Sequence, residues 1–425
     1  MLRLVAITAV FFTACQSPVG LVRDDGSKSL LAVVNSLRSP PPPNPTEDLA
    51  RQLASDLEST PFTSGFPFPP SQIRSVYIAS DYRANLLYRH HARDGAGIPL
   101  VLEAASTAPH HPQAGRFIPA TAVVRDNTLH LADPLTDQSL AADFTVPFAF
   151  HAKSHAGRSE SLKGLVSADK ITPRFHIHDP YDPDKIPLVM IHGLGASPAT
   201  WSQLTNIVLG DTSLRSRYQV WHYFYPTGVP FLEAAEEFRL GFGRFRLALA
   251  SATGLAEPRH PALFVCHSLG GLMVKTLASD SGEILQQASG LDHAETSLHF
   301  TRSPHIARAI FVASPLNGST LAAVPGAEIA YFIPSISTIA SDHPVTKAFS
   351  SIPIAPDIPF HIVLGKKFTI SKTAFSDGVV SYNNASVPGA QSTLVVPTNT
   401  HNVHTTPAAL TEIQRILYLH LADAS

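Results

Sequence analysis

The alternation of short apolar runs with longer amphipathic stretches, which begins near residue 186, constrains the fold of this chain more than any other feature. The apolar runs occupy residues 188–191, 219–224, 262–266, 309–313, 360–364 and 393–396. They are apolar at successive positions, as strands covered on both faces must be. Strands that alternate with helices predict a doubly wound, mostly parallel α/β sheet.

The stretch between the second and third runs has the clearest helical pattern. Its apolar residues recur three and four positions apart, which is the spacing of one helix face. They are Phe231, Ala235, Phe238, Phe242, Phe245 and Leu249. The same spacing predicts a closing helix over residues 408–421, and a further helix begins after Ser268.

Residues 71–180 are expected to be rich in β-strands, because short apolar runs alternate there with turn dipeptides. The runs lie at residues 76–78, 99–102, 122–124, 129–131 and 144–150. Two arrangements remain open, a separate module or the antiparallel start of the sheet that follows. No motif in this region suggests chemistry.

Composition excludes several classes of protein. The 425 residues carry a net charge of −2, so there is no basic excess to neutralise phosphates and no nucleic-acid partner is expected. Two cysteines, Cys15 and Cys266, are too few for a disulfide framework or a four-cysteine zinc site. Without a compact His/Asp/Glu set, neither a metal nor another cofactor is expected.

The first fifteen residues have the pattern of a secretory signal: a positive start, a short apolar stretch and small residues. Their end, Phe12-Thr13-Ala14-Cys15, resembles a bacterial lipobox, which predicts lipid attachment at Cys15 and a lipid-anchored protein of the bacterial cell envelope. The alternative is ordinary cleavage and secretion, or retention in the periplasm. Residues 16–70 are rich in proline and contain a short amphipathic pattern, so we interpret them as a tether.

The third apolar run ends in Cys266-His267-Ser268-Leu269-Gly270-Gly271. A serine between a strand and a helix is typical of a nucleophile elbow, a turn so tight that small residues must flank it. Cys266 stands where a glycine is usual, and Gly270 retains the second small position. Taken alone, the pattern fits equally well with a tight turn that contains an incidental serine.

The first apolar run ends in Ile191-His192-Gly193-Leu194-Gly195. Acyl transfer requires backbone N–H groups that stabilise the oxyanion of the transition state. We predict that the N–H groups of Leu194 and Leu269 have this role. We interpret His192, with Gly193, as structural in this loop.

The acid and the base of a serine hydrolase with such an elbow follow the serine in that order. Asp377 follows the fifth run and is the predicted acid, although Asp-Gly is also a common turn. His401 and His404 follow the sixth run, and we prefer His401 as the base with His404 as the alternative.

With these motifs, residues 186–420 resemble the α/β-hydrolase superfamily, in particular its bacterial lipase and esterase branch. The segment 217–228 also resembles a group of bacterial hydrolases with this domain order, in which the histidine aligned with His401 is catalytic. That group commonly has Thr-Pro-His-Arg-Gly-Ser after the fourth strand, where this chain has Ser314-Pro315-Leu316-Asn317-Gly318-Ser319. The resemblance implies an α/β-hydrolase catalytic domain over residues 181–425.

The sequence therefore predicts a serine esterase or lipase that cleaves small-molecule or lipid acyl esters through an acyl-enzyme. The same residues would serve an acyltransferase or thioesterase, and a non-catalytic envelope lipoprotein is the alternative from another class. The insertions at residues 282–305 and 320–358 are long enough to cap the site or to cover the sheet edge. The sequence predicts no oligomeric state.

Overall fold

The computed structural model describes residues 73–79, 92–93, 95–104, 117–125, 128–134, 137, 139–143, 163–165, 167, 171–177, 181–293, 295–319, 333–367 and 375–423. The predicted signal sequence, Cys15, the tether over 16–70 and the strand at 144–150 lie outside these residues. The described chain forms two compact units, one of residues 163–204 and 213–423 and one of residues 73–143 and 205–212. Each is described by itself.

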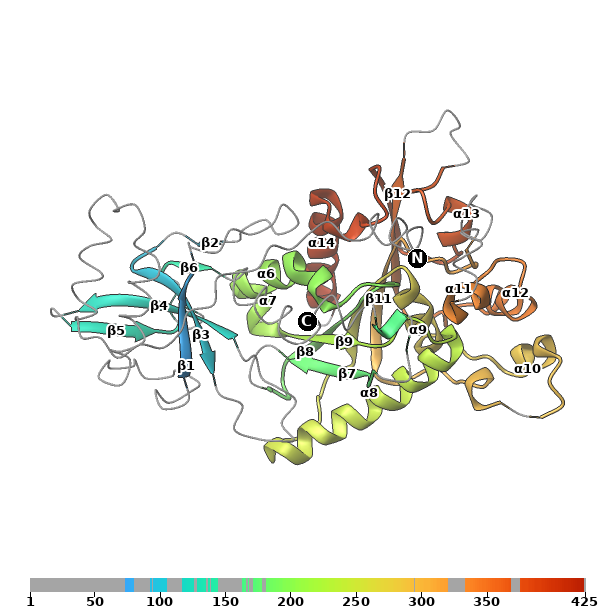
Figure 1. Ribbon diagram of the computed structural model, residues 1–425, viewed down its shortest axis with the longest axis horizontal. Coiled ribbons are helices and arrows are strands. Elements are labelled where there is room, and N and C mark those ends of the chain that lie inside the picture. The colour runs from blue at the N-terminus through green and yellow to red at the C-terminus, as the bar shows by residue number, and fades with distance from the viewer. Residues whose placement is uncertain are drawn as a thin grey trace. The chain divides into compact units, whose positions relative to one another are not determined.

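A seven-stranded sheet forms the centre of the first unit (Figure 1). Its strands are β7 (Arg174–Ile177), β8 (Ile186–Ile191), β9 (Tyr218–Phe224), β10 (Ala262–His267), β11 (Ile306–Val312), β12 (Phe360–Lys366) and β13 (Ser392–Pro397). Their order is β13-β12-β11-β10-β8-β9-β7. All neighbours are parallel except β7, which runs antiparallel to β9 at the edge. The predicted mostly parallel α/β sheet is confirmed.

The central strands are buried on both faces, which is why their sequences are continuously apolar. Every residue of β8, β9 and β10 is buried. Alternate side chains, such as Phe264 and Cys266 on β10, belong to one core that also contains helix residues. Because these strands are parallel, the carboxyl ends of β8, β10, β12 and β13 lie at the same edge of the sheet. Ligands bind at this edge in open α/β sheets.

The chain has helices between and after these strands. They are α6 (Ser202–Gly210), α7 (Thr212–Arg217), α8 (Phe231–Thr253), α9 (Leu269–Leu277), α10 (Ile284–Ser289), α11 (Pro334–Thr338), α12 (Pro344–Ser351), α13 (Tyr382–Ala385) and α14 (Pro407–Asp423). The short 3-10 turns are η4 (Pro198–Trp201), η5 (Thr296–Leu298) and η8 (Val403–Thr405). No helix in the described part of the chain combines the length and apolar character needed to cross a membrane.

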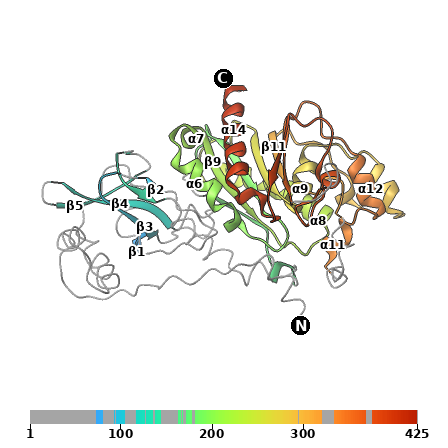
Figure 2. The ribbon, with the colours of Figure 1, turned by 90° about the horizontal axis from the view of Figure 1, so that it is seen from above.

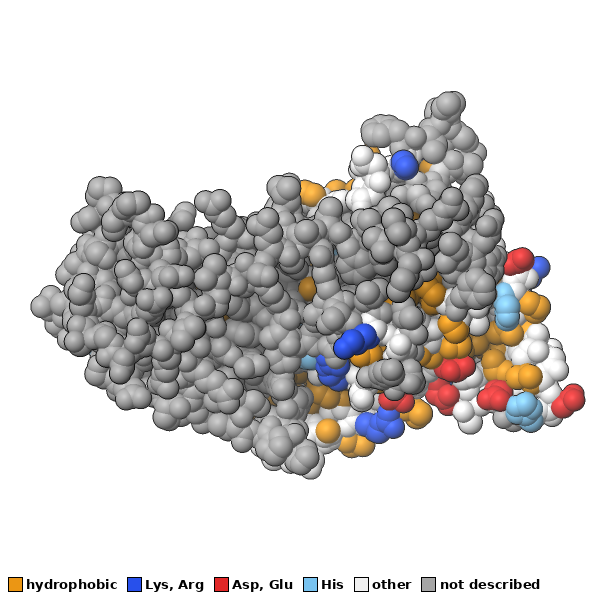
Figure 3. Space-filling model, viewed as in Figure 1, with side chains coloured by type: hydrophobic (Ala, Val, Ile, Leu, Met, Phe, Trp, Pro, Cys, Tyr) orange, Lys and Arg blue, Asp and Glu red, His pale blue; other side chains and the backbone are white. Residues whose placement is uncertain are grey.

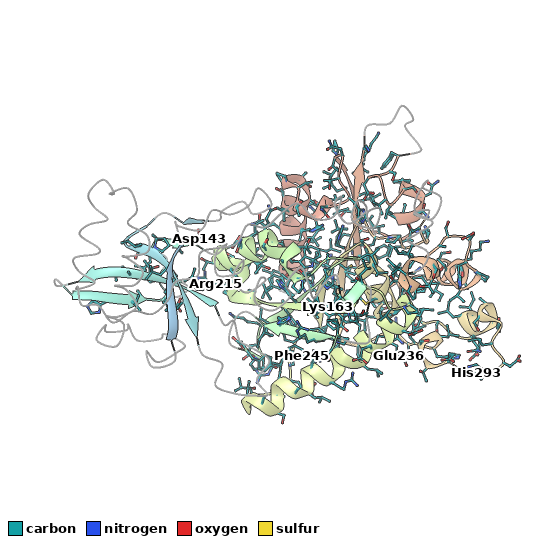
Figure 4. The ribbon with its side chains drawn as sticks, in the orientation of Figure 1. Asp143, Lys163, Arg215, Glu236, Phe245 and His293 are labelled. Carbon is teal, nitrogen blue, oxygen red and sulfur yellow. The ribbon has the colours of Figure 1, made fainter. Side chains whose placement is uncertain are left out.

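Helix α8 packs against the sheet through the aromatic face that the sequence predicts. Phe245, labelled in Figure 4, stacks on Phe175 of β7 with ring centroids 4.5 Å apart and meets Trp221 edge-on at 5.1 Å. Phe242 packs edge-on against Phe264 of β10. Offset and edge-to-face pairs of this kind add to the free energy gained from burial alone. The helix ends at Gly254, whose φ of 72° gives the left-handed cap that favours glycine.

Helix α14 confirms the closing helix expected over residues 408–421. Ile413, Ile416 and Leu417 on one of its faces are fully buried. They lie outside the core formed by α8 and α9, and Figure 2 shows α14 on the opposite side of the sheet from those two helices. The sheet is thus covered on both faces, as its apolar strands require.

The second unit contains a four-stranded antiparallel sheet in the order β1-β3-β4-β5. Its strands are β1 (Ile73–Ile78), β3 (Ile98–Ala104), β4 (Phe117–Arg125) and β5 (Thr128–Ala132), and β2 (Ala92–Arg93) pairs with β6 (Ala142–Asp143). The structure therefore decides the question that the sequence left open. Strands from this region form a sheet of their own, and β7 alone supplies the antiparallel edge of the large sheet.

The described parts of the two insertions pack on the helices of the first unit. Phe349 of α12 lies edge-on to Phe231 of α8, with ring centroids 5.1 Å apart, and to Phe300 at 6.5 Å. Residues 320–332 of the second insertion are outside the described part. On the face in Figure 3, apolar and charged side chains of the described residues are interspersed. Leu240 and Leu247 of α8 are exposed.

Lys275 joins the helix after Ser268 to the second insertion. Its side chain is 1% exposed, its ammonium donates a hydrogen bond to the Phe349 carbonyl oxygen at 2.9 Å, and it lies 4.5 Å from the Phe349 ring centroid. Burial lowers the pKa of Lys275 from 10.5 to about 7. Between these two pH values the unfolded chain holds this proton more tightly than the folded chain does, so folding gains free energy as the pH rises.

We therefore expect the free energy of unfolding to rise with pH in the wild type and to rise less in Lys275→Met. The free energy of unfolding of the wild type should rise by about 1 kcal/mol more than that of Lys275→Met between pH 7.5 and 8.5, close to the limit for one proton. Urea unfolding at both pH values measures it. The variant retains every other titrating group, so parallel pH curves for the two proteins would show that Lys275 titrates normally.

Candidate functional site

Ser268 occupies a strained turn between β10 and α9. Its backbone has φ 52° and ψ −125°, and the serine is the residue immediately before the first turn of α9. Left-handed backbone is costly for a residue with a Cβ, so such a residue marks a place where the surrounding structure imposes the conformation. The Ser268 N–H donates to the Val312 carbonyl oxygen at 3.0 Å, which fixes the turn to the neighbouring strand.

Three glycines allow other backbone segments to approach this turn. A Cβ added at Gly193 would lie 2.8 Å from Ser268 Cβ, and one at Gly270 would lie 2.7 Å from the His192 carbonyl oxygen. A Cβ at Gly271 would lie 2.2 Å from Ser314 Oγ. Side chains at these positions would force the segments apart, which explains the glycines that the sequence motif contains.

Cys266 does not disturb the turn, although it stands where the motif usually has glycine. Its side chain is fully buried in the core on the helix face of β10, and its thiol donates to the Ile310 carbonyl oxygen at 3.3 Å. Burial raises the pKa of this thiol well above its usual value. The thiol therefore takes no part in the polar site around Ser268.

His401 joins Ser268 and Asp377 in one hydrogen-bonded chain. The Ser268 hydroxyl donates to His401 Nε2 at 2.9 Å, and His401 Nδ1 donates to Asp377 Oδ2 at 2.7 Å. All three residues are buried, with exposures of 8% for Ser268, 3% for Asp377 and 8% for His401. Loops after β10, β12 and β13 supply them. The structure thus brings together the serine, the acid and the preferred histidine that the sequence predicts.

The Asp377 carboxylate is held on both oxygens. Its second oxygen, Oδ1, accepts hydrogen bonds from the backbone N–H groups of Val379 at 2.9 Å and Val380 at 2.8 Å. A Cβ at Gly365 on β12 would lie 2.6 Å from Asp377 Cβ, so the strand backbone packs directly against this side chain. Charge-assisted hydrogen bonds of this kind stabilise a buried carboxylate and fix its orientation.

His404, the alternative base, faces another partner. It shares a hydrogen bond with the hydroxyl of Thr200 in η4, and its ring contacts Trp201 with centroids 4.9 Å apart. Burial, followed by the nearby His401, lowers the pKa of His404 to about 3. It makes no hydrogen bond with Ser268 or Asp377 in the described residues.

The loop after β8 lies against Ser268 and is held by polar side chains. Thr227 accepts a hydrogen bond from the Gly195 N–H at 3.0 Å, and Tyr225 donates to the His192 carbonyl oxygen at 3.0 Å. His192 donates from Nδ1 to the Gly193 carbonyl oxygen, and burial lowers the pKa of His192 to about 4. This neutral, internally bonded ring agrees with a structural role for His192.

The backbone N–H groups of Leu194 and Leu269 have no acceptor among the described residues. Leu194 follows Gly193, which lies against Ser268, and Leu269 follows Ser268 itself. Two unoccupied donors from adjacent loops are what the stabilisation of an oxyanion next to the serine requires. That these two N–H groups stabilise an oxyanion stays a prediction from the sequence.

The polar residues that support these loops carry no signal in the sequence. Thr200, Tyr225, Thr227 and His267 bond to segments far away in the chain, and no local signal identifies such partners. Asn317, in the loop that differs from the related group, donates to the carbonyl oxygens of Asn383 and Ser386 and thus bonds this loop to the α13 segment. The described residues contain no group of His, Cys, Asp or Glu arranged to hold a metal ion.

Comparison with known proteins gives only structural matches. No model of a protein family matches the chain, and no curated protein matches it. The structure is similar to Bacillus licheniformis lipase BlEst2 in mature form, at 17% identity over 57% of this chain and 97% of that chain, with a TM-score of 0.36. It is also similar to a carboxylesterase of the thaumarchaeon Nitrososphaera gargenis, at 14% identity over 60% and 98%, with a TM-score of 0.34. A third match, butyrate-bound Thermogutta terrifontis esterase 2, has 15% identity over 61% and 91%, with a TM-score of 0.37.

The topology itself identifies the fold. A mostly parallel sheet, a strained serine between strand and helix, and an acid and a histidine that follow it in chain order are the features of the α/β-hydrolase superfamily. The fold expected from the sequence is confirmed on these grounds.

We expect a fluorophosphonate probe to label Ser268 in the wild type, because a hydrogen-bonded imidazole activates the serine hydroxyl. His401→Ala removes the only imidazole that bonds Ser268 in the described residues, so labelling should fall by at least about 10³-fold. His404→Ala should label within about threefold of the wild-type rate, since its partner is Thr200. The measurement is the second-order labelling rate of each protein.

The two histidine variants serve as controls for each other, because both remove a buried imidazole from the same loop. Normal labelling of His401→Ala, together with loss in His404→Ala, would assign the base to His404.

Proposed function

We propose that the protein is a serine hydrolase that cleaves carboxylic acyl esters through an acyl-enzyme, as carboxylesterases and lipases do. The hydrogen-bonded chain Ser268–His401–Asp377 at the carboxyl edge of the sheet is the observation that carries this proposal. A serine hydroxyl is a weak nucleophile by itself, and an adjacent imidazole held by a carboxylate is the arrangement that activates it.

In the first half of the reaction, Ser268 Oγ attacks the ester carbonyl carbon while His401 Nε2 takes the hydroxyl proton. The carbonyl π electrons move to the oxygen, and the N–H groups of Leu194 and Leu269 stabilise the resulting anion. When the tetrahedral species collapses, the bond to the alkoxy oxygen breaks. His401 donates its proton to the leaving alcohol, and the acyl group remains on Ser268.

In the second half, a water molecule repeats this sequence. His401 takes a proton from the water as it attacks the acyl carbon, and then returns that proton to Ser268 as the carboxylic acid leaves. Asp377 keeps the proton of the neutral imidazole on Nδ1 and stabilises the imidazolium that forms in each half. The two bonds from Val379 and Val380 hold the carboxylate in this position throughout.

An acyltransferase or thioesterase would use the same groups, with another acceptor in place of water or a sulfur leaving group. Analysis of products in the presence of an alcohol acceptor separates transfer from hydrolysis. The sequence features that favour the non-catalytic alternative are Cys266, in place of the usual glycine, and the altered loop at residues 314–319. The Cys266 side chain lies in the core and leaves the arrangement around Ser268 unaltered.

We expect hydrolysis of a short-chain p-nitrophenyl ester by the wild type and a loss of at least about 10⁴-fold in kcat in Ser268→Ala, because the nucleophile is gone. Ser279→Ala is the matched control, since the hydroxyl of this buried serine has no hydrogen-bond partner in the described residues. Release of p-nitrophenol measures both variants. Equal rates for Ser268→Ala and the wild type would refute the assignment of the nucleophile.

We also propose that Cys15 is lipidated and holds the protein at the bacterial cell envelope, on the strength of the apolar stretch and lipobox-like end of residues 1–15. Metabolic labelling with a fatty-acid precursor should mark the wild-type protein and leave Cys15→Ala unmarked. Label that survives the substitution would place the lipid on a residue other than Cys15. An unlabelled wild type would favour ordinary secretion.

A further inference from the structure

His267 connects the two segments that flank the nucleophile. It is the last residue of β10, is 4% exposed, and directly precedes Ser268. Its Nε2 donates a hydrogen bond to the backbone carbonyl oxygen of His401 at 3.0 Å. The bond therefore ties the strand that carries the nucleophile to the main chain of the proposed base, 134 residues later in the sequence.

The other edge of the His267 ring faces the loop after β8. A Cβ built on Gly193 would lie 2.9 Å from His267 Nδ1, so only glycine leaves room for the ring there. Nδ1 has no hydrogen-bond partner among the described residues, which assigns the single ring proton to Nε2. The ring is thus placed between the Gly193 turn and the His401 backbone.

The ring of His267 stays neutral in this position. Burial first, and then the neighbouring His404 and His401, lower the pKa of His267 well below its usual value, and His192 acts in the same direction. The centroid of the His267 ring lies 4.1 Å from that of His404 and 4.8 Å from that of His401. A neutral neighbour adds no positive charge against the imidazolium that His401 becomes during the reaction.

The His401 carbonyl oxygen accepts a second hydrogen bond, from the Val403 N–H at 2.8 Å. A carbonyl oxygen has two lone pairs, so both donors are accommodated. Removal of the His267 donor would leave the Val403 bond in place and the carbonyl satisfied. His267 is therefore not required for the local turn, and its bond has its main effect on where that turn lies relative to Ser268.

We propose that His267 is a positioning residue that sets the place of the His401 main chain relative to Ser268 and the Gly193 turn. The inference rests on the proposed function, in which His401 is the general base. Asp377 fixes one end of the imidazole, and His267 fixes the backbone from which the side chain extends. A shift of about 1 Å in a catalytic group can cost about 10²-fold in rate.

Two substitutions separate the hydrogen bond from the volume of the ring. In His267→Gln, the side-chain amide nitrogen occupies nearly the place of Nε2 and retains a donor for the His401 carbonyl. In His267→Phe, a ring of similar size remains without a donor. His404→Phe is the control, because it removes a neighbouring buried imidazole that makes no bond to the His401 backbone in the described residues.

We expect His267→Phe to lower kcat for a p-nitrophenyl ester by about 10- to 100-fold with KM changed less than about threefold, since the His267 side chain is buried. His267→Gln should retain kcat within about threefold of the wild type, and His404→Phe should do the same. Urea unfolding checks that each protein is folded. Full activity in His267→Phe, or an equal loss in His267→Gln, would overturn the inference.

A second readout needs no substrate, which keeps this inference distinct from the proposed function. The proton shared by His401 and Asp377 should give a low-field NMR resonance in the wild type and in His267→Gln, and this resonance should broaden or disappear in folded His267→Phe. An inactive wild type would refute the proposed function, whereas a resonance unchanged in His267→Phe would refute the positioning role of His267.

Discussion

The left-handed backbone of Ser268 is the constraint on which the rest of the site depends. It directs the serine side chain away from the sheet at the point where β10 meets α9, at a conformational cost of about 1–3 kcal/mol. The structure offsets this cost through the bond from Ser268 to Val312 and through the packing of α9. Glycines at 193, 270 and 271 are then necessary, because the loop after β8 and the loop that contains Ser314 meet the turn at distances that exclude a Cβ.

A second constraint is the burial of polar groups around this turn. A buried carboxylate needs several donors, and Asp377 has His401 and two backbone N–H groups. The other histidines nearby avoid the cost of a buried charge in another way, since burial lowers the pKa of His192, His267 and His404 so far that they stay neutral. The result is a buried site in which His401 is the histidine bonded to the Asp377 carboxylate.

How far the sequence could predict this arrangement depended on whether each signal was local. The continuously apolar strands and the Ser268 motif lie within a few residues, and both were identified with nearly their observed bounds. Local pattern did not separate His401 from His404, because their difference lies in Thr200, 204 positions before His404. The edge strand β7 was equally hidden, since only its antiparallel pairing with β9 shows which sheet contains it. His267 is adjacent to Ser268, yet its hydrogen-bond partner, the His401 carbonyl oxygen, lies 134 residues later in the sequence.

The buried thiol of Cys266 gives the protein a reporter of its own motions. The sequence contains no other cysteine after residue 15, and this one is fully enclosed between the central strands and the α8–α9 core. A thiol reagent in solution reaches such a group only when the surrounding structure opens. Because Cys266 lies two residues before Ser268, its rate of modification would record the opening of the structure around Ser268 without any label being introduced. The residue that departs from the usual glycine thus makes the local stability of the Ser268 turn directly measurable.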